Sequence, residues 1–286
     1  MPPDASSSPR DATIRVREGP SLRGWFWPSG RGRGVVVIAH GLGEHGGSYA
    51  HVAEGLARLA GVDVLAFDFR GHGRSPGRRG VVRRYEDLCD DLRAAVAWAG
   101  EERPGRRRFV LGHSNGGLVA LRAVLDGGLD VAGIILSNPA LRVASPVPRW
   151  KVGVGRVLRR VAPQATLDTA VDAETLTRDP AMIAARRDDP LRHSRISGPL
   201  FFGLVEGGAT VHRRAGEIAT PILLVLGESD PLIDSAFTTA VFDRLGSLDK
   251  ARATFPEALH EPLNDLDRAA ALDAVAAWLD ARLLPA

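Results

Sequence analysis

The stretch whose residues could most clearly do chemistry is Gly112-His113-Ser114-Asn115-Gly116-Gly117. An apolar run of strand character at 107–111 precedes it, and a helical pattern at 118–125, ended by two glycines, follows it. A serine with glycines two positions away on both sides, at a strand-to-helix corner, is typical of a nucleophile, because larger side chains would collide in so tight a turn. The alternative for Ser114 is an ordinary helix N-cap.

The sequence holds a second match to the same glycine–serine–glycine pattern, Gly73-Arg74-Ser75-Pro76-Gly77. No apolar strand precedes this copy, a proline interrupts it, and two arginines rather than a helix follow it. The context therefore favours Ser114 over Ser75 as the nucleophile.

A serine hydroxyl needs a base to take its proton and a third group to orient that base. In a strand-and-helix architecture the acid follows the serine, and the histidine follows the acid, each on a loop after a later strand. The loop after the strand at 221–226 contains Asp230, our predicted acid, with Asp234 and Glu228 as weaker candidates. Asp230 could instead be an N-cap ahead of Pro231, although Asp234 suits the cap of the next helix better.

The predicted base is His260, which lies in the loop after the strand at 251–255. Of the eight histidines, it is the one in the loop where the base must sit. The oxyanion of a tetrahedral intermediate also needs donors. We expect the backbone amides of Leu42, in the turn after the strand at 34–39, and of Asn115 to form this oxyanion hole. His40, with Asp68 and His72 in the loop after the next strand, is expected to be structural.

The elements that must position these residues alternate between strands and helices. Such alternation predicts an α/β fold with a mostly parallel sheet covered by helices on both faces. The predicted strands are 12–17, 22–27, 34–39, 62–67, 107–111, 131–136, 221–226 and 251–255, and the predicted helices lie near 48–59, 85–96, 118–125, 235–245 and 266–283.

An insertion interrupts this rhythm. We predict a core of residues 12–138 and 220–286, a helical cap at 139–219 over the carboxyl edge of the sheet, and a disordered tail at 1–11. Within the cap, 150–161 carries an apolar stripe opposite a basic face. This helix could rest on an anionic or micellar surface, or it could pack on its own protein, which is the favoured interpretation.

Composition excludes several classes of protein. The net charge is only +3 although the pI is about 9.6, and the arginines are scattered among acidic residues, which favours a solvated surface over nucleic-acid binding. Cys89 is the single cysteine and is expected in the core, so neither a disulfide framework nor a cysteine zinc site is expected. The sequence shows no signal-peptide or membrane-spanning pattern, so a cytoplasmic protein is expected; the oligomeric state stays open.

Five ordered motifs together resemble the monoacylglycerol lipase and lysophospholipase branch of the α/β-hydrolase family. These motifs are His40 to His45, Asp68 to Ser75, Gly112 to Gly117, Gly227 to Asp234 and the loop at His260, and the resemblance covers the chain from about residue 12. It implies the α/β-hydrolase fold and a lidded, cofactor-free serine hydrolase of single-chain lipid esters. This chain departs from the family pattern at three positions. Asn115 stands where many members carry a methionine. Ser48 and Leu263 stand where some members carry the arginine and the histidine that hold glycerol.

We therefore expect hydrolysis of a lipid ester, most simply a monoacylglycerol or lysophospholipid, through an acyl-enzyme on Ser114. Two alternatives stay open. The same scaffold could serve a short-chain carboxylesterase or a peptidase, or it could bind a ligand without turning it over.

Overall fold

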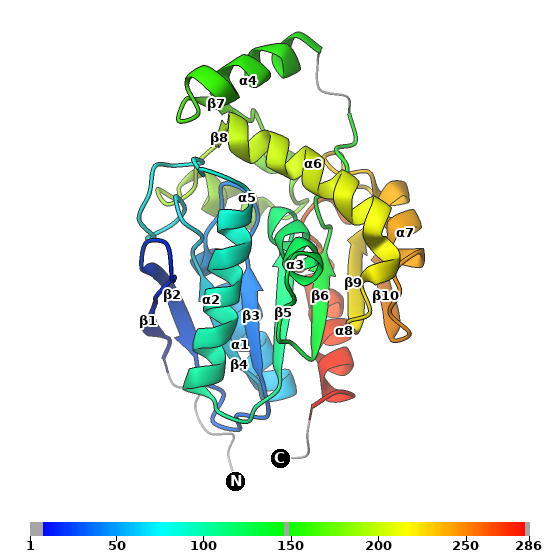
Figure 1. The fold of residues 1–286 in the computed structure, drawn as a ribbon. Helices are drawn as coiled ribbons and strands as arrows, with labels where there is room; N and C mark the ends of the chain where they lie inside the picture. The colour runs from blue at the N-terminus through cyan, green and yellow to red at the C-terminus, as the bar shows by residue number, and fades with distance from the viewer. Residues whose placement is uncertain (1–7, 146–148, 284–286) are drawn as a thin grey trace.

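The computed structural model describes residues 8–145 and 149–283 and is built around one eight-stranded sheet (Figure 1). The strand order is β1-β2-β4-β3-β5-β6-β9-β10. The strands from β4 to β10 pair in parallel, and β2 runs antiparallel to both of its neighbours, β1 and β4. The bounds are β1 Arg10–Ile14, β2 Leu22–Trp27, β3 Val35–Ala39, β4 Asp63–Phe67, β5 Arg108–His113, β6 Gly133–Ser137, β9 Ile222–Gly227 and β10 Lys250–Phe255. The predicted α/β class with a mostly parallel sheet is confirmed.

Helices cover both faces of this sheet because its central strands are apolar on both sides. On one face lie α1 (Ala50–Ala60) and α8 (Arg268–Asp280); on the other lie α2 (Glu86–Glu102), α3 (Asn115–Leu125) and α7 (Ser235–Asp243). Short 3₁₀ turns span Gly46–Tyr49, Ala173–Thr175, Ala215–Glu217 and Pro262–Asn264.

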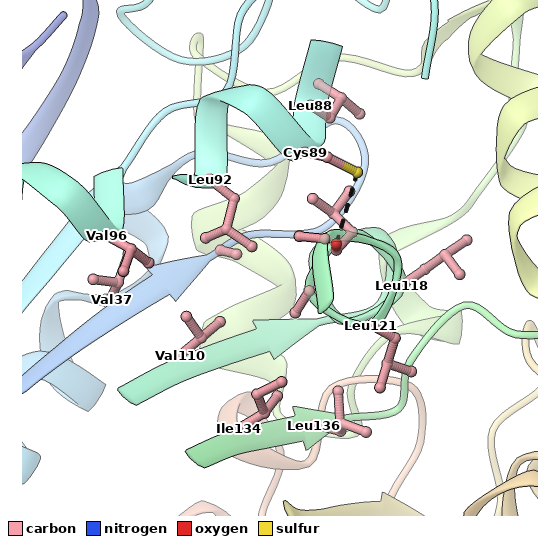
Figure 2. Packing of buried hydrophobic residues seen from close by; sticks show 14 of the residues in the cluster. Val37, Leu88, Cys89, Leu92, Val96, Val110, Leu118, Leu121, Ile134 and Leu136 are labelled. Carbon is pink, nitrogen blue, oxygen red and sulfur yellow. Dashed lines mark hydrogen bonds between the residues drawn. The ribbon is translucent and has the colours of Figure 1, made fainter. Parts of the chain in front are cut away.

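The helix that follows Ser114 is held by the core under it. Leu118 and Leu121 of α3 belong to a buried cluster that also contains side chains of α2 and of the central strands (Figure 2), and each is at most 1% exposed. Cys89 of α2 belongs to the same cluster, at 1% exposure, and its Sγ lies 3.9 Å from the carbonyl oxygen of Val119. Cys89 is thus a core residue, as the sequence predicts. The burial of α3 fixes the direction in which the Ser114 turn leaves β5.

Between β6 and β9 the chain lies across the carboxyl ends of the strands (Figure 1). The elements there are α4 Arg149–Val161, β7 Thr166–Asp168, α5 Pro180–Arg187, β8 Arg195–Ser197 and α6 Gly198–Arg214. The sequence predicts a helical insertion and a helix matching α4, but it does not indicate the antiparallel pair of β7 and β8. A three-residue strand whose partner lies far along the chain has no local pattern that could reveal it.

Strand β1 begins two residues earlier than the sequence suggests. Arg10 and Asp11, within the predicted tail at 1–11, pair with Phe26 and Trp25 of β2. Arg10 also pairs with Glu102, and its guanidinium lies 4.6 Å from the ring centre of Phe26, so these contacts extend the strand. The remainder of the predicted tail, residues 1–7, lies outside the described residues.

The outer helix α4 exposes much of its apolar stripe. Val154, Val157 and Val161 are 44%, 59% and 73% exposed, so these three positions do not pack on the protein as favoured from the sequence, whereas Leu158 of the same stripe is partly buried. Figure 1 shows α4 as the outermost element, beyond α6. Within the described part of the chain, no helix combines the length and the apolar character needed to cross a bilayer.

The glycines of the Ser114 turn are expected to be irreplaceable. A Cβ added at Gly116 would lie 2.0 Å from the carbonyl oxygen of Ala39, whereas one added at Gly153, in α4, would meet nothing within 4 Å. We expect Gly116→Ala to lower the free energy of unfolding by about 3 kcal/mol or more. Gly153→Ala should leave it unchanged or raise it by up to about 1 kcal/mol. Denaturant titration measures both, and similar effects of the two variants would contradict this account.

Candidate active site

Ser114 lies between the end of β5 and the start of α3, in a strained backbone conformation with φ 49° and ψ −116°. Its backbone is held on both sides: its N–H donates to the carbonyl of Ser137 at 2.9 Å, and its own carbonyl accepts the N–H of Ala140 at 2.9 Å. Ser114 occupies the N-cap position of α3, but its side chain accepts no hydrogen bond from a helical amide, so its hydroxyl is not used for capping. The hydroxyl is left to face the neighbouring loop.

The imidazole of His260 stands between the two other predicted side chains. Its Nε2 lies 2.9 Å from Ser114 Oγ, and its Nδ1 lies 2.6 Å from Oδ2 of Asp230. His260 is 4% exposed and Asp230 is 9% exposed, so the chain of hydrogen bonds is largely shielded from water. Three residues separated by up to 146 positions therefore meet within hydrogen-bond distance.

The carboxylate of Asp230 is kept charged by its neighbours. Its Oδ1 accepts the N–H groups of Leu232 and Ile233 at 2.8 and 3.0 Å. Burial raises the pKa of Asp230, but the imidazole of His260 and the hydrogen bonds outweigh this effect and lower that pKa. The weaker candidates lie elsewhere: Asp234 caps α7 by accepting the N–H of Phe237, and Glu228 is exposed.

Sequence reasoning missed Asn138, which contacts the acid directly. Its Nδ2 donates to Asp230 Oδ2 at 2.7 Å and to the carbonyl of Gly227 at 3.0 Å, and its Oδ1 accepts the N–H of Gly227 at 2.8 Å. The residue follows β6 with φ 38°, a conformation that asparagine tolerates better than most side chains. The sequence feature that could have indicated this residue is its position directly after a central strand.

The two predicted oxyanion donors are the amides of Leu42 and Asn115. Among the residues that the structure describes, neither amide donates a hydrogen bond. The side chain of Asn115 is occupied, because its Oδ1 accepts the hydroxyl of Tyr85 at 2.8 Å. The start of α3 adds a favourable dipole for negative charge at this point. Both amides are thus available to an oxygen of a bound ester.

A buried polar cluster adjoins His260. The ring of His113 lies 4.9 Å from that of His260, centre to centre, and burial lowers the pKa of His113 to about 3, which keeps its ring neutral. Glu44, His113 and Glu261 each place a possible metal-ligand atom within 4.8 Å of the others. The guanidinium of Arg186 pairs with Glu261, so a positive charge already balances a carboxylate there.

Ser114 and His260 open into a cavity of about 790 Å³ between the sheet and the insertion. Most of its wall is apolar: Leu158, Val171, Ile196, Phe201, Leu204 and Leu232. Glu44, Asp189 and Arg192 line a polar part of the wall, while Ser48 and Leu263 do not line it. The cavity is therefore large and apolar enough to bury a hydrocarbon chain beside the serine hydroxyl.

The other residues considered from the sequence have structural positions. Ser75 Oγ donates to the carbonyl of Asp68 at 2.6 Å and accepts the N–H of Arg23. Its hydroxyl is therefore used in hydrogen bonds to the backbone rather than presented as a nucleophile. Nε2 of His40 accepts the N–H of Phe69 at 3.1 Å. The carboxylate of Asp68 accepts two backbone N–H groups, those of residues 46 and 74, at 2.7 Å each.

A mostly parallel sheet with a serine in a strained turn between its central strand and a helix defines an α/β-hydrolase. The family described as "Serine aminopeptidase, S33" matches residues 30–267, and the chain belongs to this family. The chain is 35% identical to a monoacylglycerol lipase of Mycolicibacterium smegmatis over 88% of this chain and 89% of that protein. It is 29% identical to phospholipase YtpA of Bacillus subtilis, over 90% of this chain and 98% of that protein. A solved structure of Paleococcus ferrophilus monoacylglycerol lipase is similar with a TM-score of 0.79 and 31% identity, covering 96% and 99% of the two chains.

The two serines of the glycine–serine–glycine pattern provide a matched pair of variants. Ser114→Ala is expected to lower kcat for ester hydrolysis by roughly 10⁴-fold or more, because the attacking oxygen is lost. Ser75→Ala should retain kcat and lower the free energy of unfolding by about 1–2 kcal/mol, because it leaves two backbone groups without their partner. Steady-state kinetics and denaturant titration measure these effects. Loss of kcat in Ser75→Ala alone would contradict the assignment.

Proposed function

We propose that this chain is a serine hydrolase that cleaves the carboxylic ester of single-chain lipids, such as a monoacylglycerol or a lysophospholipid, through an acyl-enzyme on Ser114. The observation that carries the proposal is the continuous hydrogen-bonded chain from Ser114 through His260 to Asp230 at the wall of an apolar cavity. The relatives named as monoacylglycerol lipase and phospholipase support a lipid ester as the substrate.

In the first half of the reaction, Ser114 Oγ attacks the ester carbonyl while His260 Nε2 takes the hydroxyl proton. The amides of Leu42 and Asn115 stabilise the resulting oxyanion, and Asp230 stabilises the imidazolium. The bond between the carbonyl carbon and the alcohol oxygen then breaks, and His260 returns the proton to the leaving alcohol. In the second half, a water molecule gives a proton to His260 and attacks the carbonyl carbon of the acyl-enzyme. The bond between that carbon and Ser114 Oγ then breaks, and His260 returns the proton to Oγ, which releases the fatty acid and the free serine.

The insertion, residues 139–219, would act as the cap that encloses the acyl chain. Support comes from its apolar side chains in the cavity wall, among them Leu158, Ile196 and Phe201. Each methylene that moves from water into this wall contributes about 0.8 kcal/mol. A longer acyl chain should therefore bind more tightly until the cavity is filled.

Helix α4 would contact the lipid surface from which the substrate is taken. Val154, Val157 and Val161 are exposed at intervals of three and four residues, and Arg156, Arg159 and Arg160 are exposed on the same helix. An exposed apolar stripe with basic neighbours fits the boundary of an anionic membrane.

Acyl-chain length distinguishes the proposal from its alternatives on the same scaffold. With a series of p-nitrophenyl esters, we expect kcat/KM to rise by up to about tenfold for each two methylenes added, until the chain exceeds the cavity. A maximum at acetyl or butyryl would favour a short-chain carboxylesterase, and faster cleavage of a proline aryl amide would favour a peptidase. If a fluorophosphonate failed to label Ser114, a binding protein without turnover would be favoured instead.

Vesicle binding tests the role of α4. A variant with Val154, Val157 and Val161 all changed to serine should sediment with phosphatidylglycerol vesicles at least about tenfold more weakly than the wild type. Its activity on a dissolved short ester should be unchanged. Leu248→Ser, at a fully exposed leucine outside the insertion, is the control and should keep wild-type binding. Equal binding by the triple variant and the wild type would exclude α4 as the contact.

A further inference from the structure

One segment of the insertion, residues 176–193, contacts both loops that carry the proposed catalytic groups. It contains α5 and connects the 3₁₀ turn at Ala173–Thr175 to β8. On one side it contacts the loop of His260, and on the other it contacts the turn of Leu42. These segments are far apart in the chain, so their contacts depend on the tertiary fold and not on the local sequence of the segment.

Backbone and hydroxyl bonds join the segment to the chain just after His260. The N–H of Glu261 donates to the carbonyl of Leu176 at 2.9 Å, and Thr177 Oγ1 donates to the carbonyl of Asn264 at 2.8 Å. Thr177 and Glu261 are 0% and 1% exposed, so water cannot easily replace these bonds. The position of the His260 loop is therefore tied to the segment.

Arg178 adds a second, charged connection to the same loop. Its guanidinium pairs with three acidic side chains there: Glu257, Asp265 and Asp267, at 3.0, 3.2 and 2.5 Å. Asp265 is 0% exposed, and its Oδ2 accepts the N–H of Leu259, the residue before His260, at 2.9 Å. Burial raises the pKa of Asp265, but hydrogen bonds from Leu259, from the residue after Asp265 and from Arg178 outweigh it and lower that pKa. Arg178 thus stabilises the carboxylate that orients the backbone beside His260.

The other end of the segment holds the turn that carries the Leu42 amide. The N–H of His193 donates to the carbonyl of Gly43, the next residue after Leu42, at 3.0 Å. Nε2 of His45 lies 2.6 Å from Oδ2 of Asp189. The approach at Gly43 is close: its φ is +75°, and an added Cβ would lie 2.1 Å from the carbonyl oxygen of His193.

We propose that residues 176–193 form a fixed clamp that positions His260 and the Leu42 amide relative to Ser114, with Arg178 as the main positioning residue on the His260 side. The inference rests on the proposed function, because it assigns the clamp to the catalytic groups named there. Within the insertion, α4 and α6 supply apolar wall of the cavity, while this segment lines a polar part of it through Asp189 and Arg192 and also maintains the geometry of the reaction. Errors of about 1 Å in such geometry can lower a rate about 100-fold.

Arg178→Ala tests the clamp against a matched control, Arg214→Ala. Arg214 also joins the insertion to the core, through an ion pair with Asp126 and a hydrogen bond to the carbonyl of Leu125, but it contacts neither catalytic loop. We expect Arg178→Ala to lower kcat on the order of 10- to 100-fold with KM changed less than about threefold, and Arg214→Ala to keep kcat within about twofold. Equal losses of kcat in both variants, or a change confined to KM, would overturn the proposal.

Thr177 supplies a milder pair of variants if Arg178→Ala does not fold. Thr177→Val removes the hydroxyl that bonds to Asn264, while Thr177→Ser retains it. We expect the valine variant to lose about fivefold in kcat and the serine variant to stay within about twofold of the wild type. Equal activity of the two variants would exclude a positioning role for this bond.

The failure of the clamp and the failure of the proposed function give different results. If the wild-type protein cleaves no ester and Ser114 reacts with no fluorophosphonate, the proposed function fails. If the wild type is active and both Arg178→Ala and Thr177→Val keep its kcat, only the clamp fails.

Discussion

The structure depends on the close approach of backbone at the turn that carries Ser114. A Cβ at Gly112 would lie 2.7 Å from the carbonyl oxygen of Gly116, and one at Gly116 would lie 2.0 Å from that of Ala39. The turn can therefore form only where these positions lack side chains. Its strain is compensated by hydrogen bonds from β6 and by the burial of α3, so the hydroxyl points to one place in the fold.

The electrostatics of the site follow from that geometry. A negative charge at Asp230 is costly to bury unless it is paired and hydrogen-bonded. Here the imidazole of His260, two backbone amides and the side chain of Asn138 hydrogen-bond to the carboxylate of Asp230. These groups come from the loops at the carboxyl ends of β6, β9 and β10. Adjacent parallel strands end at one edge of the sheet, which is why residues from separate loops can meet there.

The insertion encloses this edge with two kinds of surface. Apolar side chains of α4 and α6 face the cavity, while the segment around α5 meets the core through buried hydrogen bonds and ion pairs. Exposed ion pairs contribute little, but those that reach Asp265 lie against a fully buried carboxylate, where the loss of a partner is expensive. Among the contacts of the insertion, those that reach Asp265 are therefore expected to matter more for the site than the exposed ion pairs.

Local patterns in the sequence predicted much of the site. Ser114 was recognisable from its glycines and its strand–helix context, and Asp230 and His260 from their order after later strands. Asn138, Arg178 and helix α5 were not recognisable in the same way. The partners of Asn138 and Arg178 lie 79 to 92 positions away, and no local spacing encodes such pairings.

By itself, the sequence determined the α/β class, the parallel core and the turn at Ser114, because these depend on short-range periodicity and on steric limits at glycine. The tertiary structure alone decided how Asn138 contacts Asp230, how the insertion contacts the loops of His260 and Leu42, and that much of the apolar stripe of α4 is exposed. The physical reason is that burial and hydrogen bonding between distant segments depend on how the elements pack, which a one-dimensional pattern does not record.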